Sequence, residues 1–324
     1  MIRNSLLPIV AFAVLALLPQ AVALAGASSL TPLATRILIY GIAAASLNLA
    51  LGHGGMVSFG QAAFFGIGGY AVGILGMQAA AHEPLFGFIP GTEQMLVTLP
   101  VAMLASGIVA AAMGALSLRT GGAQFIMITL AFAQMIFFIF VSLKVYGGED
   151  GIIINRTNSV AGLNMRDRVT LYYVTLAITA LFFAGLARVT RSSFGHIVAG
   201  LRQNERRMTA LGVTAFRYKL AALTLSGMGT GLAGALMANS LRFASPDMMS
   251  WGKSGELMVM VVLGGTGTLW GPLIGAAVLL GLESGLAAWT ENWPMGEGLV
   301  LLLVVLAAPG GISSLVTRLT GRTS

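Results

Sequence analysis

The sequence contains no cysteine and very little charge. None of the 324 residues is Cys, and only 9% are Asp, Glu, Lys or Arg. The absence of cysteine excludes disulfides, thiol catalysis and cysteine-based metal sites. The three histidines, His53, His82 and His196, are far apart in the sequence and lack ligand-like spacing. We therefore predict that the chain holds no metal.

The scarcity of charge also limits the class of protein. Soluble domains usually carry about 25% charged residues, whereas this chain is 56% hydrophobic with a mean hydropathy of +0.88. A chain without enough polar surface to face water on all sides is predicted to be an integral membrane protein. Because crossing a hydrocarbon core about 30 Å thick takes about 20 apolar residues, there is room for about ten spans.

The apolar runs predict an all-α, polytopic bundle that forms a single domain, residues 1–324. We place its ten membrane segments at 5–25, 33–52, 56–80, 95–116, 123–145, 169–190, 217–240, 255–265, 269–289 and 296–316. Arg3, the first apolar run and "ALA" at 23–25 also resemble a cleavable signal peptide, but we expect the first segment to be retained.

Glycine marks three of these segments. The 56–80 segment is dense in glycine, and the 255–265 segment is too short to cross before "GGTGTLWGP" interrupts it. Irregular backbone at membrane depth is tolerated where protein or water covers it, so both segments indicate a pathway; close helix packing is the alternative. "SGMGTGLAGAL" at 226–236 has the small-residue spacing of a close helix contact.

The distribution of Lys and Arg predicts the orientation of the chain. With a cytoplasmic N-terminus, ten crossings place eleven of the eighteen Lys and Arg residues inside, and both termini are cytoplasmic. The basic loop at 188–219 contributes most to this assignment. Arg36, Lys253 and Glu256 are assigned to the outer side. The excess of Lys and Arg on the cytoplasmic side explains the net charge of +7. A role in nucleic-acid binding is not expected, because no soluble basic domain remains to carry it.

A cytoplasmic loop at 191–216 contains the polar stretch "GLRQNERRMTALGV" at 200–213. Arg202 and Arg206 share one flank of a predicted helix, and Gly212 is placed as its C-cap. The opposite face is apolar and carries Ile197, Leu201, Met208 and Leu211. The pattern predicts one short amphipathic helix, which lies either on anionic lipid headgroups or in a groove of a cytoplasmic partner.

The chain lacks the motifs of an ATPase. "GKS" at 252–254 has Asp247 where a P-loop requires its first glycine, and "GGTGTLWG" at 264–271 has Trp270 where a dinucleotide motif requires its third. No Ser-His-Asp or paired-carboxylate arrangement occurs in one neighbourhood of the sequence. We therefore predict that the chain is not an enzyme.

Several ordered motifs resemble the membrane permease subunits of branched-chain amino acid ABC importers. They are "SLNLALGHGGMVSFGQAAFFGIGGYAVGIL" at 46–75, "GGEDGI" at 147–152, "SFGHIVAGLRQNERRMTALGVTAFRYKLAALTLSGMGTGLAGAL" at 193–236, "VVLGGTGTLWGPLIGA" at 261–276 and "APGGI" at 308–312. The resemblance implies an ABC-importer permease fold in a bacterial inner membrane. It also implies a homologous second permease, two cytoplasmic ATPases that bind ATP and Mg, and a periplasmic or extracellular solute-binding protein. The chain itself would bind no cofactor.

The resemblance further implies that residues 200–212 hold a coupling helix, which contacts an ATPase. Its expected residues are Leu201, Arg202, Asn204, Glu205, Arg206, Met208 and Gly212. Leu201 and Met208 are the expected apolar anchors, while Arg202 and Arg206 would meet acidic groups of the groove. The resemblance therefore favours a helix that docks into a groove of a cytoplasmic partner over a helix that lies on lipid headgroups. For Glu205 the alternative is a surface ion pair with Arg202 or Arg206.

Polar side chains within the predicted spans are candidates for the translocation pathway, because they are costly against lipid. They are Asn48, Ser58, Gln61, Gln124, Gln134 and Glu283; hydrogen bonding between helices is the alternative role. We expect Glu283 to be protonated, hydrogen-bonded or turned toward the bundle interior. The resemblance implies a small amphipathic solute, a branched-chain or other hydrophobic amino acid. Urea, short amides and aromatic acids are alternatives within the family, and an ion-coupled secondary transporter or a structural scaffold are alternatives of other classes.

Overall fold

The computed structural model describes most of the chain. The described residues are 15–20, 30–81, 91–92, 94–154, 165, 167–287, 289, 294–296, 298–299, 301–302 and 311–312. They are mostly helical, as expected for an all-α, multi-pass membrane protein. The predicted segments 5–25 and 296–316 lie largely outside the described residues.

Six helices in the described part of the chain are long and apolar enough to cross a membrane. They are α2 (Leu30–Asn48) with its terminal π-turn η1 (Leu49–His53), α3 (Gln61–Ala81), α4 (Met95–Ser117), α5 (Ala123–Ser142), α6 (Arg168–Arg191) and α9 (Ala215–Leu241). Six of the predicted segments, from 33–52 to 217–240, are thereby confirmed as helices of membrane length. The predicted total of ten crossings is not confirmed.

Two further helices are short. α10 (Trp251–Gly264) has 14 residues and α11 (Gly271–Ala287) has 17. At 1.5 Å per residue α10 rises about 21 Å, less than the thickness of a hydrocarbon core of about 30 Å. The 255–265 segment is therefore too short to cross, as predicted, although its helix begins four residues earlier.

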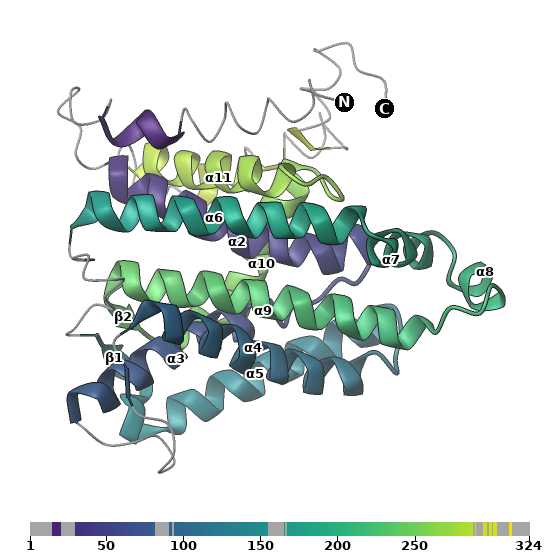
Figure 1. Ribbon diagram of the computed structural model, residues 1–324, viewed down its shortest axis with the longest axis horizontal. Helices are drawn as coiled ribbons and strands as arrows, with labels where there is room; N and C mark the ends of the chain where they lie inside the picture. The colour runs from purple at the N-terminus through teal and green to yellow at the C-terminus, as the bar shows by residue number, and fades with distance from the viewer. Residues whose placement is uncertain are drawn as a thin grey trace.

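The two ends of the bundle differ in structure. At the end called here the strand end, β1 (Ile152–Ile153) pairs antiparallel with β2 (Phe243–Ala244), flanked by the 3-10 turns η2 (Lys144–Tyr146), η3 (Gly148–Asp150) and η4 (Pro246–Met249). At the opposite, hairpin end, α7 (Ser193–Gln203) and α8 (Glu205–Ala210) extend beyond the other helices (Figure 1). The bundle therefore has two different ends, one with strands and short turns and one with a helical hairpin.

Asp167 begins α6 at the strand end. Its carboxylate accepts hydrogen bonds from the Thr170 hydroxyl at 2.9 Å and from the backbone N–H of Val169 at 3.3 Å. These bonds favour the ionised form, so they hold the pKa of Asp167 below its usual value. The carboxylate serves as the N-cap of this helix.

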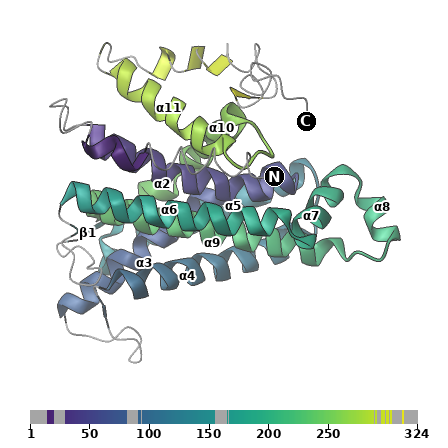
Figure 2. The ribbon, with the colours of Figure 1, turned by 45° about the horizontal axis from the view of Figure 1, so that its top comes forward.

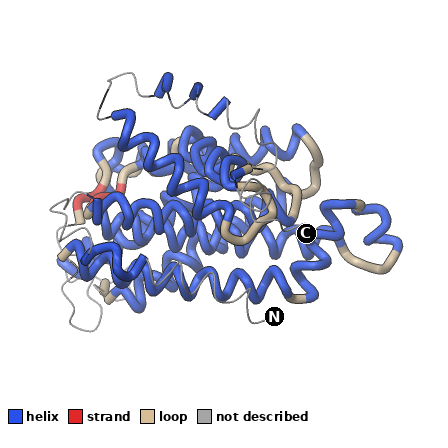
Figure 3. Tube along the Cα trace, turned by 90° about the horizontal axis from the view of Figure 1, so that it is seen from above, coloured by secondary structure: helices blue, strands red, loops and turns tan. Residues whose placement is uncertain are grey.

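α9 is the central helix of the bundle. It packs most extensively against α4, α3 and α2, and it runs between α6 and α2 on one side and α3, α4 and α5 on the other (Figure 1). α10 and α11 pack together beyond α2, as the turned view shows (Figure 2). Seen from above, the long helices run lengthwise through the molecule, with two short strands at one end (Figure 3).

Glycines let α3 and α9 touch backbone to backbone. A Cβ atom added at Gly68 would lie 1.9 Å from the carbonyl oxygen of Gly231, and one at Gly234 would lie 1.8 Å from that of Phe65. Both distances are far shorter than van der Waals contact, so a side chain at either glycine would push the two helices apart. The predicted close contact of the 226–236 stretch is confirmed.

The predicted 56–80 segment starts too early, because residues 54–60 are not part of the helix. Neighbouring hydroxyls satisfy the backbone of this stretch. Ser254 Oγ donates to the carbonyl of Phe59 at 2.6 Å and accepts from the N–H of Ala62 at 2.9 Å, while Thr129 Oγ1 accepts from the N–H of Phe59 at 3.3 Å. Buried non-helical backbone needs such partners in a membrane. The stretch 54–60 is thus stabilised as non-helical backbone by hydroxyl groups of α5 and α10.

The contact between α3 and α9 predicts a position-specific effect of a single methyl group. Gly68→Ala places that methyl group against a backbone carbonyl that cannot rotate away, so we expect the free energy of unfolding to fall by about 1–3 kcal/mol. Gly76→Ala on the same helix is the matched control, because no atom lies within 4 Å of its added Cβ. Thermal unfolding of the two variants in detergent measures the difference; equal stability would contradict the packing described.

Candidate functional site

The basic stretch predicted as a coupling helix forms a helical hairpin. Residues 193–210 fold into α7 and α8 between the ends of α6 and α9, and α8 lies at the tip (Figures 1 and 2). Most side chains near the tip are exposed, including Arg202, Asn204, Glu205, Arg206, Arg207, Thr209, Ala210 and Leu211. The hairpin thus presents a basic surface outside the bundle.

The prediction of one continuous helix through this stretch is wrong. Asn204 adopts φ −157° and ψ 97°, which ends α7, and its Oδ1 accepts a hydrogen bond of 2.9 Å from the backbone N–H of Arg207 at the start of α8. Asn is among the best N-cap residues because its side chain replaces a missing backbone partner. Gly212 follows α8 with φ +88°, so its predicted role at the C-terminal end of the helix is confirmed.

This break separates the residues of the predicted apolar face. Leu201 on α7 is 3% exposed and buried within the chain itself, so in this structure it is not available as an anchor for another protein. Met208 turns back toward Gly200, where an added Cβ would lie 2.9 Å from its sulfur. Leu211, which was not among the expected contact residues, is 72% exposed at the end of α8.

Glu205 links the hairpin to the bundle. Its carboxylate lies 2.6 Å from the ammonium nitrogen of Lys219, near the start of α9. The alternative named for Glu205, a surface pair with Arg202 or Arg206, is therefore wrong. Sequence spacing favoured those partners within one helix, but the turn after α8 brings α9 alongside instead.

A junction of three elements lies at the base of the hairpin. Arg202 Nη1 of α7 donates a hydrogen bond to the carbonyl oxygen of Gly52 in η1. Asn48, at the end of α2, donates from Nδ2 to the carbonyl of Thr268 at 2.7 Å, and its Oδ1 accepts from the N–H of Gly267 at 2.9 Å. The end of α2 thereby holds both the hairpin and the loop 265–270 between α10 and α11.

The junction requires glycine at position 52. A Cβ atom there would lie 2.0 Å from Asn48 Oδ1 and 2.5 Å from the backbone nitrogen of Gly267. Any side chain would displace the loop that Asn48 binds. The π-turn η1, which covers Leu49–His53, places this glycine at the contact, and such turns are frequent at functional sites.

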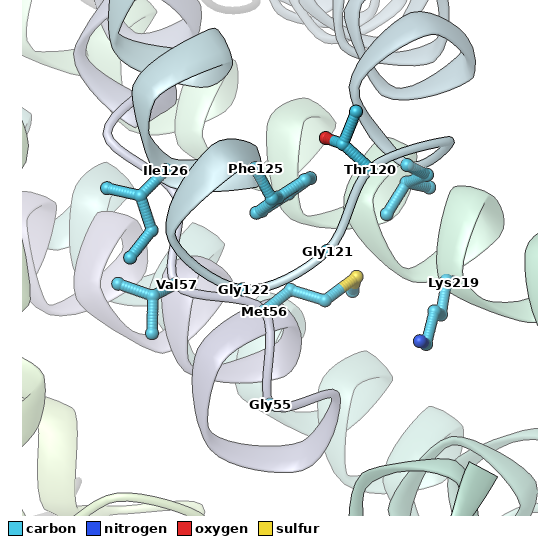
Figure 4. A pocket seen from close by; sticks show the side chains of 10 residues that line it. Gly55, Met56, Val57, Thr120, Gly121, Gly122, Phe125, Ile126 and Lys219 are labelled. Carbon is cyan, nitrogen blue, oxygen red and sulfur yellow. The ribbon is translucent and has the colours of Figure 1, made fainter.

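Two neighbouring cavities open at the hairpin end. One, of about 480 Å³, is lined by Leu51, Gly54, Gly55, Val57, Leu201, Arg202, Glu205, Lys219 and Thr266. The other, of about 190 Å³, shares Gly55, Val57 and Lys219 with it. Figure 4 shows Lys219 across the smaller cavity from Val57 and Ile126. Both cavities adjoin the non-helical stretch 54–60, where the backbone leaves its helix.

Three of the candidate pathway residues are buried near this stretch or at the junction. Asn48 is 2% exposed, and Ser58 and Gln61 are fully buried. Gln61 donates from Nε2 to Ser226 Oγ at 3.0 Å and accepts from the Thr230 hydroxyl at 2.8 Å, while Ser226 donates to the carbonyl of Ser46 at 2.6 Å. The Gln61 amide therefore joins α2, α3 and α9, which is the alternative role named for such residues.

The other three candidates lie elsewhere. Gln124 is exposed at the start of α5 and Gln134 is half-buried further along that helix. Glu283 of α11 lies 3.5 Å from Arg36 of α2 and is hydrogen-bonded to it, which matches one of the three environments expected for this acid. The structure does not bring the six residues together, and their role in translocation stays a prediction.

One charged pair within the bundle is missed by the sequence prediction. Lys253 was expected in an outer loop, before the 255–265 segment, and this is wrong: it lies in α10 with Glu256, and its Nζ is 2.7 Å from Glu256 Oε2. Their i,i+3 spacing was a usable signal, but the helix begins earlier than hydropathy indicates. Among the described residues, no group of three or more His, Asp or Glu side chains is placed to hold a metal ion.

Comparison with known proteins identifies a family. The family described as "Branched-chain amino acid transport system / permease component" matches residues 29–309. The chain is 26% identical over 304 residues to the high-affinity branched-chain amino acid transport system permease protein LivM of Salmonella typhimurium, covering 86% of this chain and 69% of that protein. No solved structure matches the chain.

Shorter matches link the chain to permeases with other names. It is 25% identical over 138 residues to the xylose transport system permease protein XylH of Escherichia coli, which covers 40% of this chain and 35% of that protein. It is 30% identical over 152 residues to the autoinducer 2 import system permease protein LsrC of Klebsiella pneumoniae, which covers 44% and 43%.

The junction predicts that Arg202 and Arg206 differ in effect. Arg202→Ala removes the hydrogen bond to Gly52, worth about 1 kcal/mol for a partly exposed charged donor, so we expect about fivefold faster amide exchange in α7 and in residues 265–270. Arg206→Ala on α8 is the control and is expected to leave this exchange unchanged. Hydrogen exchange read by mass spectrometry measures both; equal protection in the two variants would contradict the junction.

Proposed function

The chain belongs to the family of branched-chain amino acid transport system permease components, and from this premise we propose that it is the membrane permease of an ATP-driven importer. The family assignment makes it a multi-pass transport subunit. The further proposal concerns its partners, its orientation and its solute. One observation supports it above all: a basic helical hairpin extends beyond the bundle and is hydrogen-bonded to the end of α2 through Arg202 and to the start of α9 through Glu205.

We infer that the hairpin end faces the cytoplasm of a bacterium and that the protein lies in the inner membrane. The positive-inside rule supports this orientation. Basic residues gather at the hairpin end, which carries Arg188, Arg191, Arg202, Arg206, Arg207, Arg217 and Lys219. The strand end carries fewer, Lys144, Arg168 and Arg242, together with the acids Glu149, Asp150, Asp167 and Asp247. Both chain termini are cytoplasmic in this proposal.

The proposed assembly contains two permeases, two ATPases and a solute-binding protein. The sequence lacks a P-loop, so the ATP and Mg would be bound by separate ATPase subunits, and this chain binds no cofactor. Each permease would present α8 to one ATPase, and the solute-binding protein would deliver its cargo at the strand end. The second permease would be a homologue that shares the pathway.

The proposed solute is a branched-chain or other hydrophobic amino acid. The match to LivM extends over 86% of this chain, whereas the xylose and autoinducer 2 permeases match 40% and 44% of it. Urea, short amides and aromatic acids are the alternatives within the same architecture. An ion-coupled secondary transporter is the alternative from another class, and the pairing of Glu283 with Arg36 disfavours it because the acid already has a cationic partner.

The exposed side chains of α8 define how the hairpin would dock. Leu211 is 72% exposed and follows Arg206 and Arg207, both exposed. An apolar side chain surrounded by charge is typical of an interface, with the apolar group in a desolvated pocket and the charges at the rim. We propose Leu211 as the anchor in the ATPase groove, in place of the buried Leu201.

Leu211→Asp tests this docking. A charge placed in a desolvated pocket without a partner costs a few kcal/mol, so we expect ATPase affinity to fall at least tenfold and solute-stimulated ATP hydrolysis to fall with it. Val145→Asp is the matched control, since Val145 is 77% exposed at the strand end. Retention of the ATPases on the purified permease and hydrolysis in proteoliposomes are measured. Normal assembly and coupled hydrolysis with Asp at position 211 would exclude α8 as the contact.

A further inference from the structure

Lys253 and Glu256 form an ion pair inside the bundle that no step of the proposed function uses. The two residues lie in the first two turns of α10, with Lys253 Nζ 2.7 Å from Glu256 Oε2. Lys253 Nζ also lies 5.7 Å from the ring centroid of Tyr40 on α2, close enough for a cation–π contact. The ammonium group is thus positioned by both a carboxylate and an aromatic ring.

The pair lies near the middle of the membrane-spanning bundle. Tyr40 is ten residues from the first residue of α2, Leu30, and thirteen from the last residue of η1, His53, or about 15 Å and 20 Å at 1.5 Å per residue. Because the Lys253 ammonium group lies beside Tyr40, it is far from either end of this helix.

Part of this pair is exposed on the surface of the single chain. The side chains of Lys253 and Glu256 are 32% and 23% exposed, and the neighbouring Trp251 is 61% exposed. A charged side chain at the centre of a bilayer costs about 2.5–3.5 kcal/mol on insertion scales, so such groups face water-filled cavities or other protein rather than lipid. This face of α10 is accordingly expected to border an aqueous route.

A second ion pair lies on the adjoining helices. Arg36 is four residues from Tyr40 on α2 and therefore shares its face, and it pairs with Glu283 of α11 at 3.5 Å with side chains 33% and 26% exposed. The helices α2, α10 and α11 pack against one another. Two partly exposed ion pairs thus lie on the same group of helices. A surface that faces lipid would not carry them.

We propose that Lys253 and Glu256 bind the head group of a zwitterionic amino acid as it crosses the membrane. The inference rests on the proposed transport function. The Lys253 ammonium group would receive the solute carboxylate, the Glu256 carboxylate would receive the solute ammonium group, and Trp251 would contact the apolar side chain. In the empty site the two charges satisfy each other, and a zwitterion replaces that pairing with two new ion pairs. An uncharged sugar offers neither charge, so the site favours amino acids over sugars.

Paired neutral substitutions distinguish a binding site from a structural salt bridge. Removal of one partner leaves an uncompensated charge in either case, whereas replacement of both restores a structural pair, often at little cost. We expect the single variants Lys253→Gln and Glu256→Gln, and also the double variant, to lower leucine uptake at least tenfold. Retention of the ATPases on the purified permease shows whether each variant assembles.

The experiment uses the complete importer in proteoliposomes with radiolabelled leucine and, in parallel, xylose. Normal leucine uptake by the double variant would overturn the site while leaving the proposed function in place. Uptake of xylose but not leucine by the unmodified importer would instead overturn the proposed solute. If the Gln variants do not assemble, Lys253→Arg and Glu256→Asp keep both charges and shift their positions. A raised half-saturating leucine concentration in these variants is then expected, and an unchanged one would overturn the site.

Discussion

The hydrogen bonds at the end of α2 are the constraint on which the arrangement of this permease depends. Asn48 holds the loop between α10 and α11 through Gly267 and Thr268, and the carbonyl of Gly52 accepts from Arg202 of the hairpin. The hairpin is also joined to the bundle by the buried side chain of Leu201 and by the pair of Glu205 with Lys219. Only the bonds at the end of α2, however, connect α7 to α2 and α2 in turn to the α10–α11 loop.

Non-helical backbone within the bundle also needs hydrogen-bond partners. The stretch 54–60 is non-helical, and α10 begins near Tyr40, within the length of α2; each interruption exposes backbone groups that lipid cannot satisfy. The Ser254 hydroxyl of α10 satisfies groups at Phe59 and Ala62, so it supports the stretch 54–60. The two cavities at the hairpin end adjoin this stretch, and the pair of Lys253 with Glu256 lies at the start of α10.

The sequence predicted the parts of the fold that depend on length and hydropathy. Six long apolar runs are helices, the 255–265 run is too short to cross, and the glycines of 226–236 mark a close contact, because each follows from a local physical property. Residue periodicity could not predict that Asn204 would end α7, since a polar residue on an exposed face is equally compatible with a continuing helix. Nor could it reveal that Leu201 packs against its own chain, because an apolar face does not identify what covers it. Lys253 was placed in a loop because a charged residue in front of an apolar run does not show where the helix begins. Its pairing with Glu256 becomes visible only once the start of α10 is known.

The central claim, that the end of α2 holds both the hairpin and the α10–α11 loop, predicts that the two move as one unit. Spin labels at Ala210 on α8 and at Thr266 in the loop, both exposed, report the distance between them in the complete importer with and without ATP. A second pair, Ala210 with Val145, serves as the reference, because Val145 is 77% exposed at the strand end, away from the junction. The account predicts that ATP leaves the 210–266 distance unchanged while the 210–145 distance shifts. A change in the 210–266 distance of the same size as that of the reference pair would contradict it.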